Sequence, residues 1–211
     1  MITASHHWFL YPFFEWYGDI RISNHFKKIY ITGDIADRDL PFLIIPNHFS
    51  WWDGFFISYL NRRFFHKKFH VMMLEQQLRT HSYFRKTGAF SIESSPKDII
   101  KSMCYAAEIL QNPENLLTFF PQGQFESSYQ QPLHFKKGIS WLLNNLRNEV
   151  RVIFAANLTE YFESPKPHLF IYFMEYNYRE LGTDSTQIEK YYNDFYKKSF
   201  KQNLSVKNKT Y

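Results

Sequence analysis

Short apolar runs that end at a proline or a polar residue recur along this chain, and they alternate with amphipathic segments. Residues 42–45 (FLII) are continuously apolar and are followed by Pro46, which is typical of a strand buried on both faces. Strands are also expected at 29–32, 69–73, 116–120, 151–156 and 169–174. Alternation of such strands with helices predicts an α/β fold, with a mostly parallel central sheet and helices on both faces.

The helical pattern is clearest after Ser95. Pro96 takes the first helical position and Asp98 the third, which gives an N-cap serine, a proline at N1 and a capping-box carboxylate. A shorter helix is expected near 139–146. A long last helix is expected from about Ser185, with Ile188, Tyr192, Phe195 and Phe200 inward and its lysines outward. The predicted inner stripe of the Ser95 helix also holds Cys104 and comprises Ile99, Met103, Ala106 or Ala107, and Leu110.

Composition narrows the class of protein. With 211 residues, 45% of them hydrophobic and 21% charged, the chain is neither disordered nor a coiled coil. A single cysteine excludes an internal disulfide framework and a zinc site built from several cysteines. We expect an N-terminal region over 1–28 and an α/β domain over 29–205, with no metal and no redox cofactor.

Aromatic residues are abundant, at 20% of a chain whose formal net charge is +5. One explanation of this enrichment is codon bias in an AT-rich genome, and the other is a basic, aromatic surface that rests on a membrane interface. Residues 8–17 (WFLYPFFEWY) are interrupted by Pro12 and Glu15 and are too short to span a bilayer. Trp and Tyr favour the membrane interface, so we expect this segment to lie on a membrane surface. The alternative is a first helix packed on the domain.

A basic run with interleaved phenylalanines, RRFFHKK, occupies residues 62–68. Cations of this kind attract anionic lipid head groups, at about 1 kcal/mol each. The run therefore predicts a contact with the membrane. There are two alternatives. In the first, the run binds the phosphates of an acyl donor, and in the second it is an exposed loop with no binding role.

A polar pair, Asn47-His48, follows the buried strand at its carboxyl end, where open α/β sheets carry their sites. Asp53 comes five positions after His48, and in a regular helix that separation puts two side chains roughly 140° apart. They meet only if the chain turns between them, which Ser50 would allow as an N-cap with Asp53 at the third helical position. A His–Asp pair can act as a general base with an orienting carboxylate. The alternative is a capping carboxylate beside a structural histidine.

The Asn47-His48…Asp53 pattern resembles the NHxxxxD motif of the glycerolipid acyltransferase superfamily, which includes the 1-acylglycerol-3-phosphate acyltransferases. Residues 88–93 (GAFSIE) are similar to the second block of that family. Phe120-Pro121-Gln122-Gly123, followed by Ser127, is similar to the third. Residues 135–138 (FKKG) match the Phe-Lys-x-Gly that commonly follows, and 152–156 (VIFAA) stand where the fourth block belongs, without its proline. The resemblance runs from about residue 33 to residue 173.

This resemblance implies an O-acyltransferase that moves a fatty acyl group from acyl-CoA or acyl carrier protein to a hydroxyl of a lyso-lipid. It implies a peripheral or monotopic protein on the cytoplasmic face of a membrane, with no metal and no nucleic-acid partner. His48 would be the general base and Asp53 its partner. The implied substrate-binding residues are Asn47, Gly88, Phe120, Pro121, Gln122, Gly123, Gln124 and Lys136.

Several residues depart from the family pattern. Gln122, Gln124 and Phe125 stand where the third block has Glu, Thr and Arg, and Ser94 stands where the second has Arg. In the family these arginines are associated with the acceptor's phosphate, a task for which a permanently charged, planar fork is suited. We therefore expect an acceptor other than a simple glycerol phosphate.

Three alternatives stay open. A 1-acylglycerol-3-phosphate acyltransferase could hold the phosphate with other cations, such as Lys86, Lys97 or Lys136. A non-catalytic lipid-binding relative would have no chemical need for both His48 and Asp53. A basic, aromatic nucleic-acid-binding protein would bind RNA rather than vesicles in a salt-dependent way.

Overall fold

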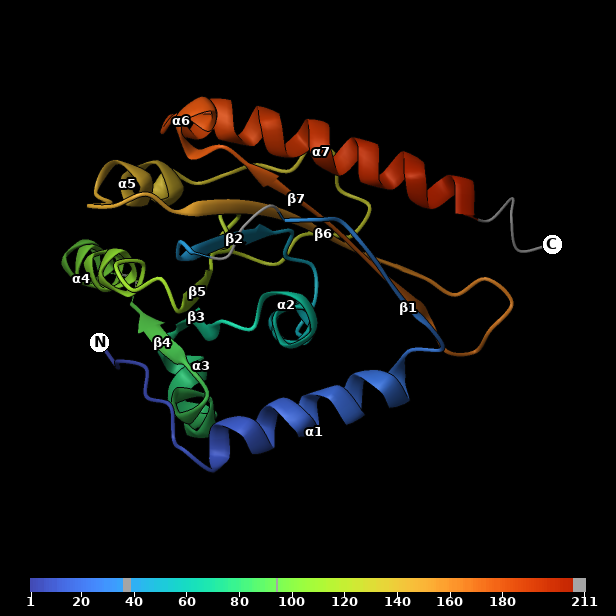
Figure 1. The fold of residues 1–211 in the computed structure, drawn as a ribbon, viewed down its shortest axis with the longest axis horizontal. Coiled ribbons are helices and arrows are strands. Elements are labelled where there is room, and N and C mark those ends of the chain that lie inside the picture. The colour runs from blue at the N-terminus through green and yellow to red at the C-terminus, as the bar shows by residue number, and fades with distance from the viewer. Residues whose placement is uncertain (36–38, 94, 207–211) are drawn as a thin grey trace.

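A single mixed sheet forms the centre of the computed structural model, which describes residues 1–35, 39–93 and 95–206 (Figure 1). The strand order is β1-β7-β6-β2-β5-β3-β4. The strands are β1 (Ile29–Thr32), β2 (Phe42–Pro46), β3 (Lys68–Leu74), β4 (Ala89–Ile92), β5 (Asn115–Thr118), β6 (Arg151–Glu160) and β7 (His168–Tyr176).

β2 lies in the middle of the sheet and is buried along its whole length. It runs parallel to both neighbours, so that Ile44 lies opposite Thr118 of β5 and Ile153 of β6. The predicted fold class is therefore confirmed. The antiparallel pairing of β6 with β7 was not predicted, although the chain contains its cause. Only residues 161–167 separate the two strands, whereas a crossover to a parallel strand needs about a dozen residues or more.

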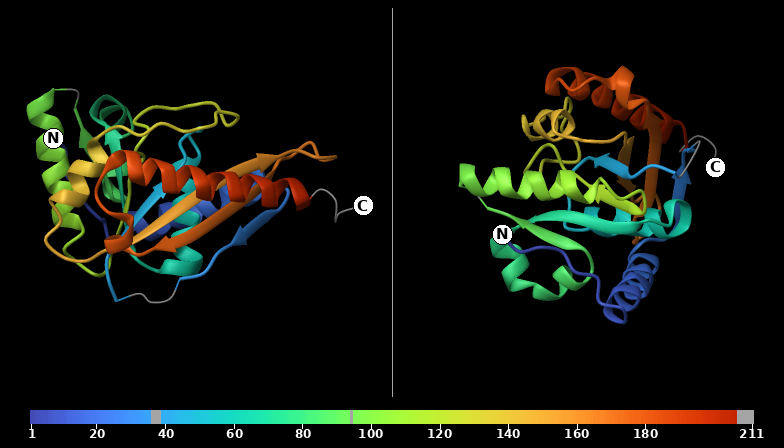
Figure 2. Two further views of the ribbon diagram at one scale, coloured as in Figure 1. Left: turned by 90° about the horizontal axis from the view of Figure 1, so that it is seen from above. Right: turned by 60° about the vertical axis from the view of Figure 1, so that its left-hand side comes forward.

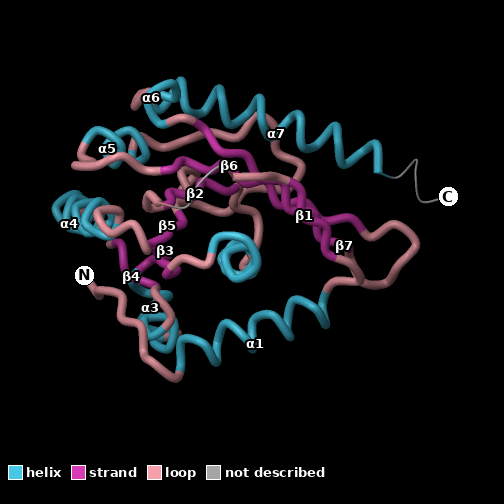
Figure 3. The backbone as a smooth tube through the Cα atoms, viewed as in Figure 1, coloured by secondary structure: helices cyan, strands magenta, loops and turns pink. Residues whose placement is uncertain are grey.

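Helices cover both faces of the sheet (Figures 1 and 2). One face is covered by α1 (Leu10–His25) and α2 (Asp53–Leu60), and the other by α4 (Pro96–Ile109), α5 (Gly138–Asn144) and α7 (Ser185–Val206). In Figure 3, α1 and α7 lie on opposite sides of the strands. The shorter elements are α3 (Glu75–Thr80), α6 (Tyr178–Leu181), a π-helix η1 (Asn61–Phe65) and a 3₁₀-helix η2 (Ser82–Lys86).

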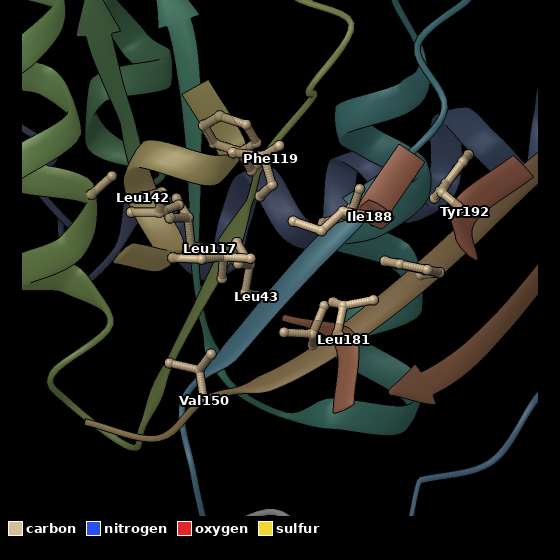
Figure 4. Packing of buried hydrophobic residues seen from close by; sticks show 14 of the residues in the cluster. Leu43, Leu117, Phe119, Leu142, Val150, Leu181, Ile188 and Tyr192 are labelled. Atoms are coloured by element: carbon tan, nitrogen blue, oxygen red, sulfur yellow. The ribbon is translucent and has the colours of Figure 1, made fainter. Parts of the chain in front are cut away.

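The core is divided into two clusters by the sheet. Alternate residues of a strand point to opposite faces, so Leu43 joins the cluster under α4, α5 and α7 while Ile44 joins the cluster under α2. Figure 4 shows the first cluster, in which Leu43 lies beside Leu117 of β5, and to which α5 contributes Leu142 and α7 contributes Ile188 and Tyr192. The predicted inward face of the last helix is confirmed at Ile188 and Tyr192.

α4 begins as its capping pattern predicts, since Ser95 Oγ accepts the Asp98 N–H at 3.3 Å. The predicted inner stripe was partly wrong. Met103 is buried, but Ile99 and Cys104 are exposed. Consecutive helical residues are roughly 100° apart, so Cys104 points away from the buried side that Met103 defines.

α1 extends well beyond the aromatic run and contains Pro12, which was expected to interrupt it. Pro12 is the third residue of the helix. The first four N–H groups of a helix have no acceptor within it, so a proline at this position removes no hydrogen bond. The helix continues to His25 and buries Gly18 and Ile22.

The residues before α1 lie along the edge of the sheet beside β4. The Ser91 N–H donates to Ile2 O at 2.8 Å, and His6 Nε2 lies 2.8 Å from Phe69 O of β3. Gly88 makes this approach possible, because a Cβ at that position would lie 2.0 Å from Phe69 O and 2.7 Å from His6 Nε2. The N-terminal residues therefore pack directly on the sheet.

Candidate active site

His48 and Asp53 meet at the carboxyl edge of the sheet, just beyond β2. His48 Nδ1 lies 2.9 Å from Asp53 Oδ2. The same oxygen accepts the N–H of Phe49 at 2.7 Å and of Ser50 at 2.9 Å. An ionised carboxylate only accepts, so Nδ1 carries the imidazole proton and Nε2 is left as an acceptor.

The turn between the two residues differs from the predicted one. α2 begins at Asp53 itself, so Asp53 is not the third helical residue and Ser50 is not the N-cap. Ser50 Oγ accepts the Trp52 N–H at 3.1 Å instead. The Asp53 carboxylate reaches back to the N–H groups of Phe49 and Ser50, and this keeps the intervening residues outside the helix.

Asp53 is fully buried. Its Oδ1 has no hydrogen-bond partner among the residues that the structure describes. Burial raises the pKa of the Asp53 carboxyl above its ordinary value, and the hydrogen bonds from His48 and from the Ser50 and Phe49 N–H groups offset part of that rise. The hydrogen bonds from His48, Phe49 and Ser50 hold the carboxylate against the imidazole.

Asn47 joins the ends of β2 and β6. Its Nδ2 donates to Asn157 O at 3.0 Å, and its Oδ1 accepts the Asn157 N–H at 2.8 Å. These two bonds continue the pairing of the strands past Pro46, which has no N–H to contribute. The structure thus gives Asn47 a contact that positions the chain at His48, in addition to the substrate contact expected from the motif.

The loop after β5 closes over His48. Gln122 is buried, its Oε1 accepts the His48 N–H at 2.7 Å, and its Nε2 donates to Glu126 Oε2 at 2.5 Å. The Glu126 N–H donates to His48 O at 2.9 Å. The rings of Phe120 and Phe125 lie against the imidazole, with centroid distances of 4.0 and 4.2 Å.

The remaining third-block residues form a tight turn beside this loop. The Gly123 N–H donates to Phe120 O at 3.2 Å, and its φ of +66° suits glycine. Pro121 O accepts the Lys136 N–H at 2.9 Å, and Lys136 Nζ lies 3.5 Å from Gly123 O. Gln124 is exposed. The structure therefore brings the predicted residues 120–124 and 136 together on the His48 side of the sheet.

One predicted residue of the second block, Gly88, is not brought to this site. Gly88 lies at the amino end of β4, three strands away from β2 and at the opposite end of the strand from the His48 edge. Its close contact with Phe69 O accounts for glycine at this position. Ser94, the other departure of interest, lies outside the described residues.

The basic run 62–68 is part of helix η1 and the start of β3 rather than an exposed loop. Arg62 Nε and Arg63 Nη1 lie 3.4 and 3.3 Å from Asp19 Oδ2 of α1. Lys67 is buried, and its Nζ donates to Pro113 O at 2.7 Å. The two arginines thus attach α1 to the end of α2.

A family model described as Acyltransferase matches residues 28–157, more than half of the chain. The chain belongs to the acyltransferase family. The match includes His48, Asp53 and the loop that carries Gln122.

The acyltransferase is also similar to a solved structure, that of the 1-acyl-sn-glycerophosphate (LPA) acyltransferase PlsC from Thermotoga maritima. The TM-score is 0.66 at 14% sequence identity, and the similarity covers 90% of this chain and 78% of the other. At this identity the likeness establishes the fold. A comparison with curated proteins gives no match. Within the described ranges, no helix has both the length and the apolar character needed to cross a bilayer.

Tyr192 of α7 reaches the site from outside the matched region. It is fully buried, its hydroxyl donates to Ala155 O at 2.7 Å, and it also bonds the backbone of Asn47. Burial raises the pKa of Tyr192 well above its ordinary value, so the hydroxyl remains a donor. This side chain fixes the residue that precedes the base.

We expect Tyr192→Phe to lower kcat by about fivefold with little change in KM, since a lost hydrogen bond of about 1 kcal/mol would shift His48 without removing it. Steady-state kinetics would measure this. The matched control is Tyr172→Phe, which removes a buried hydroxyl bonded to Asn203 Oδ1 at 3.3 Å and should lower stability alone. Equal kcat values for the two variants would contradict a positioning role.

Proposed function

We propose that this acyltransferase moves a fatty acyl group from a thioester to a hydroxyl of a lyso-lipid, with His48 as general base and Asp53 as its orienting partner. The 2.9 Å contact between His48 Nδ1 and Asp53 Oδ2 carries this proposal. The His48 side chain is 20% exposed while that of Asp53 is fully buried. A substrate can therefore reach the base, whereas water cannot reach its partner.

In the proposed reaction, His48 Nε2 takes the proton of the acceptor hydroxyl as its oxygen attacks the thioester carbonyl carbon. The carbon–sulfur bond then breaks, and the imidazolium returns its proton to the departing thiolate. The products are an ester and a free thiol. N–H donors are needed for the developing oxyanion. The Gly123 N–H already bonds Phe120 O, which leaves the amino end of α2 near Gly54 as the candidate.

The donor in this proposal is acyl-CoA or acyl carrier protein, which present the same phosphopantetheine thioester. The acceptor is a lyso-lipid other than lysophosphatidic acid, the substrate named for the Thermotoga maritima protein. Phe125 and Gln122 put an aromatic ring and a neutral amide beside His48. Neither side chain carries a positive charge, so neither can form a charge-assisted hydrogen bond to a phosphate, which would be worth about 1.5–3 kcal/mol.

We further propose that α1 rests on the cytoplasmic face of a membrane. Apolar side chains lie on its outward side as well as against the protein. Glu15 and Asp19 face the protein, whereas Phe13 and Trp16 are 41% and 53% exposed. Apolar rings turned outward in this way suit a lipid interface. We call this surface the aromatic face of α1; it comprises Trp8, Phe9, Phe13, Trp16, Tyr17 and Ile20.

A row of ring contacts continues from the aromatic face of α1 toward the site. Phe14 stacks on Tyr83, Tyr83 contacts Phe84, Phe84 contacts Phe55, and Phe55 contacts Trp51, with centroid distances of 5.3, 4.5, 5.9 and 4.8 Å. Trp51 follows His48 by three positions and is exposed. This continuity would let a lyso-lipid pass from the bilayer to the base along an apolar path.

We expect lysophosphatidic acid to give a kcat/KM at least about tenfold below that of the best lyso-aminolipid or glycolipid acceptor, from the loss of a charge-assisted bond. The measurement is release of free thiol by purified protein, with acyl-CoA and with acyl carrier protein donors. If lysophosphatidic acid is the best acceptor and Lys136→Ala removes that preference, the relocated phosphate site is right instead. Lipid binding without turnover of any donor would favour the non-catalytic alternative.

A further inference from the structure

Glu126, in the loop after β5, is linked to His48 by a backbone hydrogen bond and through the Gln122 amide. Its Oε2 accepts Gln122 Nε2 and its N–H donates to His48 O. No ion pair involves Glu126 in the part of the chain that the structure describes. Lys136, at the end of the same loop, bonds Gly123 O. Within the described ranges, the Glu126 carboxylate therefore has a neutral amide as its partner and no ion pair.

Aromatic rings accompany this charge. Phe125 precedes Glu126, is 51% exposed, and lies 4.2 Å from the His48 ring. Phe120 covers the imidazole at 4.0 Å. A carboxylate together with exposed aromatic rings is the combination that binds an ammonium group, by charge and by cation–π attraction. The same combination repels a phosphate monoester.

The Gln122 amide links this charge to the base. Its Oε1 holds the His48 N–H and its Nε2 holds Glu126, and the orientation of the amide is fixed because Gln122 is buried. A glutamate in place of Gln122 would put two carboxylates in contact at this point, which is unfavourable. Gln122 and Glu126 therefore depend on each other.

We propose that the preferred acceptor is a lyso-lipid whose head group carries an ammonium, bound by Glu126 and Phe125 while the acceptor hydroxyl lies at His48 Nε2. This inference rests on the proposed function and specifies its acceptor. Two sources share the chemistry: a zwitterionic lysophospholipid with an amine head, and a monoacylated amino-acid lipid.

The test compares each amine acceptor with a derivative that lacks the positive charge. Lysophosphatidylethanolamine and a monoacylated amino-acid lipid are each assayed beside their N-acetyl derivatives, which lose the charge and gain an acetyl group. We expect the intact protein to favour each amine that it uses by about tenfold or more in kcat/KM, and Glu126→Gln to bring this ratio close to one. Glu163→Gln, on the exposed loop between β6 and β7, should leave the ratio unchanged.

A charge reversal gives a second readout. Glu126→Arg should invert the preference, so that lysophosphatidic acid gains relative to the amines. Circular dichroism would show whether each variant is folded, and the conservative Glu126→Gln keeps the test valid if the arginine is not tolerated. The inference is supported if the intact protein prefers either amine lipid over its N-acetyl form and Glu126→Gln loses this preference. The amine lipid that shows the effect is then the acceptor type.

Two results would overturn it. Equal kcat/KM values for each amine and its N-acetyl form, in the presence of measurable transfer, would reject the ammonium site while the acyl-transfer function stands. No transfer to any acceptor would reject the proposed function, and the ammonium site with it.

Discussion

Replacing His48 with alanine is expected to lower kcat by about 10²–10⁴-fold, the usual range for loss of a general base. In the proposed reaction, the imidazole contacts Asp53 through Nδ1 and takes the proton of the acceptor hydroxyl at Nε2. Thiol release at saturating acceptor would measure the loss. The melting temperature and vesicle binding should stay near those of the intact protein, because the loop after β5 is held by the backbone N–H and O of His48 rather than by its imidazole. Near wild-type transfer by His48→Ala would exclude the dyad.

Asp53→Asn tests the other half of the pair. The amide leaves His48 without an orienting anion, so kcat should again fall by about 10²-fold or more. Because burial raises the pKa of the Asp53 carboxyl, the ionised form is destabilised in the fold, and its contribution to stability falls as pH rises from the unfolded-state pKa to the folded one. We therefore expect Asp53→Asn to lose activity at pH 7 without losing stability. A large fall in melting temperature would show that the residue is mainly structural.

Removing two rings from the aromatic face of α1 should have the next largest effect. Phe13→Ser with Trp16→Ser is expected to weaken binding to anionic vesicles by about 100-fold, because each buried ring contributes about 1.5 kcal/mol or more. Co-sedimentation at two salt concentrations would measure it, since salt weakens only the electrostatic part. The matched control is Tyr161→Ser with Tyr191→Ser, which removes exposed rings on β6–β7 and α7. Equal losses in both double variants would contradict a specific lipid-facing surface.

Point substitutions serve here better than a truncation. Deleting residues 1–18 would seem the direct way to remove the aromatic segment. The structure shows that Ile2 and His6 bond the strands at the edge of the sheet and that Gly18 is buried against α2. Such a deletion would therefore damage the fold and the lipid surface together.

The centre of the sheet could be predicted from the sequence because strands buried on both faces leave continuous apolar runs. β4 was not predicted in this way, because its four residues include a polar serine, Ser91, and do not form a continuous apolar run. The contact between His48 and Asp53 depended on a turn whose form the spacing left open. The turn itself is set by Asp53 bonding the N–H groups of Phe49 and Ser50.

Glu126 could not be identified in advance, because a glutamate in a polar loop has the appearance of a solvated residue. Its proximity to His48 arises from a backbone hydrogen bond and from the Gln122 amide, which no motif spacing encodes. A carboxylate four positions after Gln122 was the available signal. The orientation of α1 was equally hidden, because apolar residues occur on all sides of it and only packing decides which of them face outward.

α1 is attached to opposite edges of the sheet. The residues before it lie along β4, and the residues after it lead into β1, which are the two outermost strands. The helix is about 24 Å long from its 1.5 Å rise per residue, comparable with the width of the sheet that it crosses (Figure 1). An anchor on a flexible linker lets a catalytic domain tumble above a bilayer, whereas one fixed at both ends does not. In the proposed membrane-bound state, the fold would set the height of His48 above the lipid surface, and the enzyme would then select hydroxyls at one depth of the head-group region.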